Sequence, residues 1–145
     1  MNVEETARDY VNKMADPEKI KAYLTPDAMV SGSVLPQPIP GTQALGILGA
    51  WTTAMPDIKF DIREVKVNGN DATVQLNWGG TQSGPLSLPF PGMPTIPATG
   101  KKVWVKDTYT LTVKDGKVSY MRLDAAADGG MPGALAQLGV NMPGM

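Results

Sequence analysis

The most regular pattern in the chain is the stretch VWVKDTYTLTV at residues 103–113. Apolar and polar residues alternate along it, which is the pattern of a β-strand with one buried face. The expected buried face carries, in order, Val103, Val105, Asp107, Tyr109, Leu111 and Val113. The stretch therefore predicts a strand that places one carboxyl group, that of Asp107, among apolar side chains. Because burial disfavours the ionised form, we expect a raised pKa for Asp107.

Further strands are expected on both sides of this stretch. Alternation of apolar and polar residues predicts strands at 58–67, 72–78 and 118–125. The apolar face changes at residues 63–64, which indicates a bulge, and the Asn-Gly pair at 68–69 is typical of a hairpin. These features predict that the second half of the chain folds as a meander of antiparallel strands.

The first half of the chain is expected to be mainly helical. Apolar residues at helical spacing predict amphipathic helices at 3–14 and 42–55. A short helix is expected to start after Asp16 and to end before Pro26, because the residue before a proline avoids the helical conformation. An extended segment is expected at 27–34. Helices followed by strands predict an α+β fold, and 145 residues suit one domain.

A long loop, residues 79–102, connects two of the predicted strands. It contains five prolines, which restrict its conformations, and its apolar side chains Phe90, Met93 and Ile96 need burial. A loop of this length inside a compact domain is usually a lid or a binding loop. We therefore expect it to fold over the mouth of a pocket.

The composition excludes several classes of function. The chain has no cysteine and no histidine, which rules out disulfides, thiol nucleophiles and Ser-His-Asp catalysis. Its formal net charge of −1 provides no basic excess for binding nucleic acid. No stretch reaches the ~20 apolar residues of a membrane helix, and the first residues lack the pattern of a signal peptide. We expect a cytoplasmic protein that uses no metal ion or cofactor and contacts neither nucleic acid nor membrane.

Short motifs follow one another in a definite order along the chain. They are Gly41 before the third predicted helix, Pro56-Asp57 after it, Gly80 to Gly84, Thr99 to Val103, Asp115 to Val118, and Gln137 to Gly139. In this order the chain resembles the SnoaL-like polyketide cyclase and ester cyclase group of the nuclear transport factor 2-like superfamily. The resemblance covers nearly all of residues 1–145. It implies a cone-shaped, curved antiparallel sheet with three N-terminal helices packed on its concave face, around a hydrophobic pocket.

The resemblance also assigns two site positions. The cyclase group has a histidine inside the segment that matches residues 80–84, where this chain has Gln82. The group also has an acid/base aspartate late in the last strand. Its expected place is near Ala126, with Asp124 before it and Asp128 after it. Asp124 is our candidate, and Asp128 remains the alternative match.

A second resemblance, to the ketosteroid isomerases of the same superfamily, concerns an oxyanion hole. Those enzymes combine a tyrosine on the first helix with a protonated aspartate on a strand. Tyr10 and Asp107 match that pair. The position of their general base falls at residues 31–32, Ser-Gly, which cannot abstract a proton. The alternative for Asp107 is a structural carboxyl group, satisfied by a neighbouring tyrosine or by Arg122.

The expected function is the binding of a small apolar molecule in the pocket, with acid–base chemistry of the cyclase or isomerase type on a carbonyl compound. The candidate catalytic residues are Asp107, Tyr10 and Asp124. The candidate substrate-binding residues are Trp51, Tyr109, Arg122, Phe90, Met93, Tyr120 and Gln82. A non-catalytic ligand-binding protein or a dimeric scaffold of the same fold is the alternative. For Arg122 and Asp124 the alternative is a solvated ion pair at the edge of a strand.

The second face of the 103–113 strand predicts a partner. It carries Trp104, Thr108, Thr110 and Thr112, and Lys106 is the only charge on it within the strand. A flat, weakly charged face of this kind is more easily covered by protein than solvated. We therefore expect a homodimer that forms through this outer face of the sheet.

Overall fold

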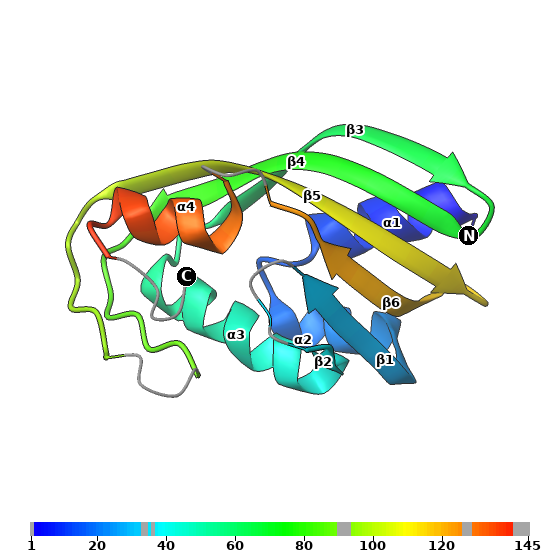
Figure 1. Cartoon of the computed structure of the whole chain (residues 1–145), viewed down its shortest axis with the longest axis horizontal. Coiled ribbons are helices and arrows are strands. Elements are labelled where there is room, and N and C mark those ends of the chain that lie inside the picture. The colour runs from blue at the N-terminus through cyan, green and yellow to red at the C-terminus, as the bar shows by residue number, and fades with distance from the viewer. Residues whose placement is uncertain (1, 33–34, 36, 90–93, 126–128, 141–145) are drawn as a thin grey trace.

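The computed structural model describes residues 2–32, 35, 37–89, 94–125 and 129–140. Its elements are α1 Val3–Asn12, α2 Pro17–Ile20, the 3-10 helix η1 Lys21–Tyr23, β1 Leu24–Gly32, β2 Ile39–Pro40, α3 Gly41–Ala54, β3 Lys59–Asn68, β4 Asp71–Thr81, β5 Lys102–Lys114, β6 Lys117–Leu123 and α4 Gly130–Gln137. The strands form one sheet in the order β2-β1-β6-β5-β4-β3, which curves over the helices (Figure 1). Within these residues, no helix has the length and apolar character needed to cross a membrane.

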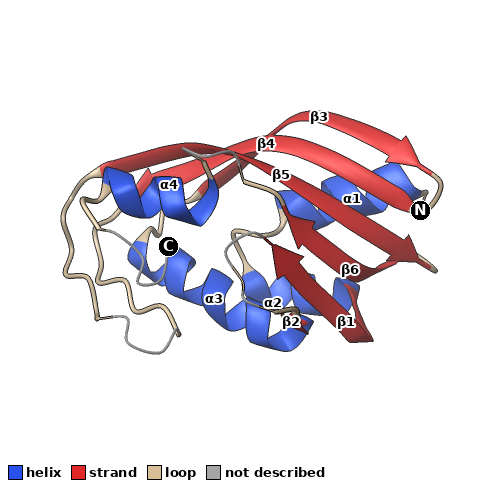
Figure 2. Ribbon diagram, in the orientation of Figure 1, coloured by secondary structure: helices blue, strands red, loops and turns tan. Residues whose placement is uncertain are grey.

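The curved sheet and its helices confirm the predicted α+β fold. Neighbouring strands are antiparallel except β1 and β6, which pair in parallel. The expectation of a fully antiparallel sheet needs this correction, because most of the chain separates β1 from β6 and no hairpin fixes their relative direction. The helices lie on the concave side of the sheet, with α4 against β5 (Figure 2).

Local sequence signals account for the position of α1. The Asn2 side chain accepts a hydrogen bond from the Glu5 backbone amide at 2.8 Å, and its own amide group donates to the Glu5 carboxylate at 3.0 Å. The first bond makes Asn2 the N-cap of the helix, and the second ties its side chain to that of Glu5. The buried side of α1, which includes Ala7, Tyr10 and Val11, packs against the sheet. Tyr10 is therefore part of the core.

The β5 strand follows the predicted alternation of buried and exposed residues. Its expected inner face is buried, including Asp107. β4 pairs with β5 along its length and places Leu76 opposite Asp107. The bulge predicted at residues 63–64 is confirmed as a register shift between Ile62 and Glu64. Asp107 therefore lies on the inner face of the central strands, among the side chains that pack on the helices.

The start of β1 differs from the prediction. The strand begins at Leu24 and runs through Pro26, whereas an extended segment was expected only from residue 27. Leu24 pairs with Val118 of β6, and the register is irregular between Leu24 and Met29. A proline fits in such an irregular part of a strand, because its missing N–H breaks no regular ladder there. Pairing with β6, which is distant in the sequence, therefore starts β1 earlier than the local sequence predicted.

The long loop is shorter than predicted, because β4 continues to Thr81 and β5 starts at Lys102. Within the loop, Leu86 and Ile96 pair as an isolated antiparallel bridge, and both side chains are buried in the core. The expected burial of Ile96 is therefore confirmed. Phe90 and Met93 lie outside the described residues.

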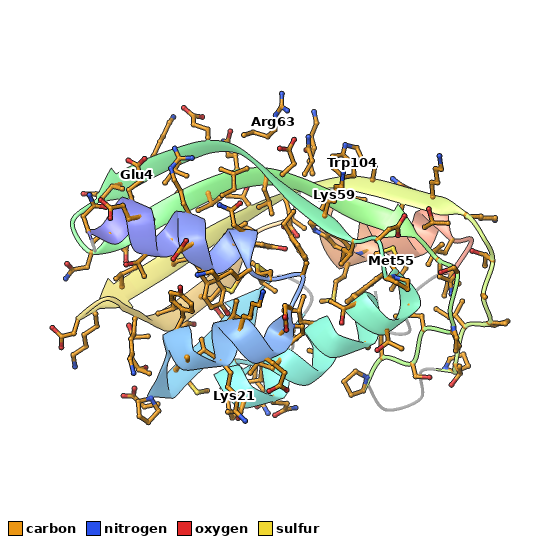
Figure 3. The ribbon with its side chains drawn as sticks, turned by 180° about the vertical axis from the view of Figure 1, so that it is seen from behind. Glu4, Lys21, Met55, Lys59, Arg63 and Trp104 are labelled. Carbon is orange, nitrogen blue, oxygen red and sulfur yellow. The ribbon has the colours of Figure 1, made fainter. Side chains whose placement is uncertain are left out.

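The outer side of the sheet carries an exposed tryptophan. Trp104 is 50% exposed and lies, like Arg63, on the side of the sheet away from α3 (Figure 3). Its backbone N–H and carbonyl both bond to the side-chain amide of Gln137 in α4, each at 2.9 Å. β6 pairs with β5 only from Tyr109 onward, so Gln137 provides the hydrogen bonds that β6 does not supply to this part of β5.

Candidate functional site

A cavity lies between the concave face of the sheet and α3. Its volume is about 90 Å³, against roughly 10–15 Å³ for one water molecule measured in the same way. Side chains from helices and strands line it, among them Leu45, Leu48 and Trp51 of α3, Tyr10 of α1, Met14 just after α1, Met131 of α4, and Val30, Phe60, Trp78, Asp107, Tyr109, Met121 and Leu123 of the sheet. Most of this wall is apolar, so the cavity suits a small apolar molecule that fills it.

A few polar side chains interrupt the apolar wall. Among the described residues that line the cavity, Asp107 is the only one with a carboxyl group, and Tyr10 and Tyr109 provide hydroxyl groups. The structure therefore brings four of the predicted site residues to one cavity, namely Asp107, Tyr10, Tyr109 and Trp51. No three acidic side chains of the described residues lie close enough together to hold a metal ion.

Hydrogen bonds hold the carboxyl group of Asp107 in place. The indole Nε1 of Trp78 donates to Oδ2, and the backbone amide of Thr108 donates to Oδ1, both at 3.0 Å. The side chain is only 8% exposed, and this burial raises the pKa of Asp107 above its usual value. The bonds from Trp78, Thr108 and the Tyr109 hydroxyl lower the pKa in part, and the charge of Asp124 raises it further. Burial has the largest effect, so Asp107 holds its proton to a higher pH than an exposed aspartate does.

The two tyrosines of the cavity keep their protons at neutral pH. Burial raises the pKa of Tyr10 and that of Tyr109, and the neighbouring Asp107 raises the pKa of Tyr109 further. The hydroxyl of Tyr10 forms no hydrogen bond with another described residue. It is therefore available as a donor to a molecule in the cavity.

Aromatic packing fixes the tryptophan that holds Asp107. The rings of Trp51 and Trp78 meet edge to face, with centroids 5.2 Å apart, and Phe60 stacks on Trp78 at 6.1 Å. Such pairs add to the stability gained from burial and limit the motion of the ring. The alternation at residues 72–78 predicted a strand that includes Trp78, but it did not indicate that this indole bonds to Asp107, because the bond joins two different strands.

Three predicted site residues of the last strand do not reach the cavity. Met121 and Leu123 line it, so the alternate residues Tyr120, Arg122 and Asp124 project to the other side. Arg122 and Asp124 form an exposed ion pair at 2.7 Å, and the hydroxyl of Tyr120 donates to Ser31. The placement agrees with the alternative of a solvated pair, and Asp124 acts on Asp107 only through its charge.

Gln82 does not line the cavity either. Its side chain is fully buried and ties down the loop after β4. Nε2 donates to the carbonyl groups of Ile96 and Pro97 at 3.4 and 3.1 Å, and Oε1 accepts from the amide and the hydroxyl of Thr99 at 3.2 and 2.6 Å. The loop itself lies beside the end of α3, where Gly84 donates to Ala54. Its described residues stay outside the cavity wall, contrary to the expectation of a loop that covers the pocket.

The structure adds wall residues that are not among the predicted site residues. Gly130 and Met131, at the start of α4, line the cavity. Gly130 has φ +59°, and a Cβ atom there would lie 2.5 Å from the Cβ of Ala125 and 3.4 Å from Oδ2 of Asp107. A glycine at this position therefore lets α4 start close to the carboxyl group. The glycine-rich sequence before α4 has no helical periodicity that could have indicated this contact.

Replacing Asp107 with asparagine is expected to change stability in a pH-dependent way. The pKa of Asp107 is higher in the folded chain than in the unfolded chain. The protonated group therefore stabilises wild-type protein at low pH, and this stability is lost as the pH rises through the folded-state pKa. Asparagine does not titrate. The melting temperature of Asp107→Asn relative to wild type should therefore rise between about pH 4 and about pH 7. Thermal melts at both pH values measure this, and a constant difference would contradict a raised pKa.

Comparisons with known proteins agree with this fold. The family model of the SnoaL-like domain matches residues 7–121. A protein from Jannaschia sp. CCS1 assigned as a SnoaL-like polyketide cyclase is 25% identical, with a TM-score of 0.68 over 83% of each chain. IdmH from Streptomyces antibioticus, assigned as a polyketide cyclase, is 19% identical, with a TM-score of 0.73 over 97% of this chain and all of the other. No curated protein matches the chain in sequence.

A designed protein has a similar fold. A de novo designed protein with a curved β-sheet is 19% identical to this chain, with a TM-score of 0.58 over 87% of this chain and 86% of the designed one. Likenesses at this level of identity show the architecture alone. The fold and the cavity define an α+β protein with a curved, open sheet and an apolar interior site. The family match makes the assignment specific: the chain belongs to the SnoaL-like domain family.

Proposed function

We propose that the chain binds a small, mainly apolar carbonyl compound in the cavity and acts on it by acid–base chemistry of the cyclase or isomerase type. The observation that carries this proposal is a buried carboxyl group with a raised pKa, that of Asp107, in the wall of an otherwise apolar cavity. Groups of this kind are enriched at functional sites. The SnoaL-like family and the polyketide cyclase assignment of the Jannaschia protein support the same class of function.

The proposed chemistry uses the donors of the cavity wall. A protonated Asp107 gives its proton to the carbonyl oxygen, and the carboxylate left behind removes a proton from the α-carbon, so that the enol forms and Asp107 is protonated again. The hydroxyl of Tyr10 is a second donor to the same oxygen. Trp78 and Thr108 keep the carboxyl group in one orientation, which lowers the cost of reorganisation during the reaction. The apolar wall excludes water and strengthens these interactions.

Cyclohexanone and cyclohexane, which share their shape, test the binding and the chemistry. We expect wild-type protein to bind both in calorimetry and to accelerate the exchange of the α-protons of cyclohexanone in D₂O, followed by NMR. Asp107→Asn should lower this exchange by about 10²-fold or more, because an amide does not transfer the proton. Tyr10→Phe should weaken the binding of cyclohexanone about three- to tenfold and leave cyclohexane unchanged.

The outcomes separate the proposal from its alternative. Wild-type protein that binds neither probe would contradict a ligand-binding cavity. Binding without exchange, or equal exchange in Asp107→Asn, would favour the second candidate, a non-catalytic binding protein. A specific observation supports that candidate: among the described residues of the cavity wall, Asp107 is the only carboxyl group, so no second carboxylate there acts as a base.

We also propose that the chain forms a homodimer through the outer face of the sheet. Trp104 is half exposed on this face, next to the partly exposed threonines of β5. A typical dimer buries about 800 Å² of each partner and persists at micromolar concentration. Sedimentation velocity at that concentration should show a particle of twice the chain mass of 15.4 kDa. A single species of the chain mass would argue against the dimer, and Trp104→Glu should produce that species if the face is the interface.

A further inference from the structure

One indole group in the cavity wall has no hydrogen-bond partner. Trp51 of α3 lines the cavity and is only 3% exposed. Its Nε1 is buried and finds no acceptor among the described residues, and no other side-chain nitrogen or oxygen of those residues is both fully enclosed by protein and unpaired. Nearly all buried polar groups of folded proteins are paired, because an unpaired donor loses its bonds to water without replacement. The unpaired indole therefore requires an explanation.

The other two tryptophans do not share this feature. Nε1 of Trp78 donates to Asp107 at 3.0 Å, and Trp104 is 50% exposed to solvent. Packing does not require the N–H of Trp51 either. Its ring meets Trp78 edge to face at a centroid distance of 5.2 Å, a contact that a phenylalanine ring also makes. Neither the core nor the aromatic pair therefore accounts for a nitrogen at this place.

We infer that Trp51 is a ligand-binding residue whose indole N–H donates a hydrogen bond to an oxygen atom of the molecule in the cavity. This inference rests on the proposed function, because it needs a ligand in the cavity. Trp51 contacts Trp78, and the indole of Trp78 is bonded to Asp107, so Trp51 and Asp107 are two donor groups that both lie next to Trp78 in the wall. A ligand with two oxygen atoms would occupy both, and the second bond would fix its orientation.

The experiment compares cyclohexane, cyclohexanone and cyclohexane-1,4-dione, which have the same ring and no, one or two oxygens. In wild-type protein, the Trp51 indole proton should shift downfield in the NMR spectrum of the dione complex and not in the cyclohexane complex. Trp51→Phe identifies this signal, because it removes one of the three indole peaks. It should also weaken the binding of the dione about three- to tenfold more than that of cyclohexane.

Trp104→Phe is the matched control, because it removes an exposed indole outside the cavity and should change neither affinity nor the Trp51 signal. If cyclohexanone or the dione binds and the Trp51 indole signal keeps its position in both complexes, the inference is wrong and the proposed function stands. If none of the three molecules binds, the proposed function itself fails, and the inference fails with it. The NMR measurement on wild-type protein gives a result even if Trp51→Phe does not fold.

Discussion

Replacing Gly79 with alanine is expected to lower the stability of the chain by more than about 3 kcal/mol. A Cβ atom at this position would lie 1.8 Å from the carbonyl oxygen of Val103 and 2.6 Å from its carbonyl carbon. Both atoms belong to the backbone of β5, which pairs with β4 here through Gly79 and Trp104. They cannot move away without breaking this part of the ladder. Since native domains are stable by only about 5–15 kcal/mol, much of the variant should be unfolded.

A matched control for this variant is Gly46→Ala. Gly46 lies exposed in α3, and a Cβ atom there would have no other atom within 4 Å. Alanine in the middle of a helix is favoured over glycine, so this variant should be more stable by about 0.5–1 kcal/mol. Urea unfolding of the two variants measures both effects. Equal stabilities would show that β4 and β5 do not approach each other this closely at Gly79.

Replacing Gln82 with leucine is expected to cost about 2–4 kcal/mol of stability. Leucine has nearly the size of glutamine but no polar atoms, so four hydrogen bonds are lost, to the carbonyl groups of Ile96 and Pro97 and to the amide and hydroxyl of Thr99. Burial of Gln82 is complete, so water replaces these bonds poorly. The loop between β4 and β5 should then open at a lower denaturant concentration than the rest of the chain.

The same variant distinguishes a structural role of Gln82 from a role in ligand binding. Because Gln82 does not line the cavity, Gln82→Leu should bind cyclohexanone like wild-type protein at a temperature where both are folded. Thr99→Val removes one partner of Gln82 and should cost less, about 1 kcal/mol. If Gln82→Leu had unchanged stability and bound cyclohexanone more weakly, Gln82 would be a ligand-binding residue, as the family resemblance implied.

Patterns that are local in the sequence predicted a large part of the fold. The alternation around Asp107 fixed which face of β5 is buried, because successive side chains of a strand point to opposite sides. The change of apolar face near Glu64 is likewise set by residues a few positions apart. The same local reasoning put Tyr10 on the inner side of α1, and the cavity contains both Tyr10 and Asp107.

The tertiary structure decided how the last strand contributes to the site. The sequence of β6 allows either face to point inward, since Tyr120 and Met121 are both largely apolar. Pairing with β5 and with β1 turned Met121 to the cavity and Arg122 with Asp124 to the solvent. A strand changes the side of all its residues when its register moves by one position, so this choice depends on neighbours that are distant in sequence.

The partners of the polar groups were also decided only in three dimensions. Asp107 bonds to Trp78 of the neighbouring strand β4. Gln82 bonds to the carbonyl groups of Ile96 and Pro97, 14 and 15 residues further along the chain. The indole of Trp51 has no partner among the described residues. Spacing along the chain gives no information on such pairs. A hydrogen bond requires heavy atoms within about 3 Å and a suitable angle, and only the packed elements bring distant residues into that geometry.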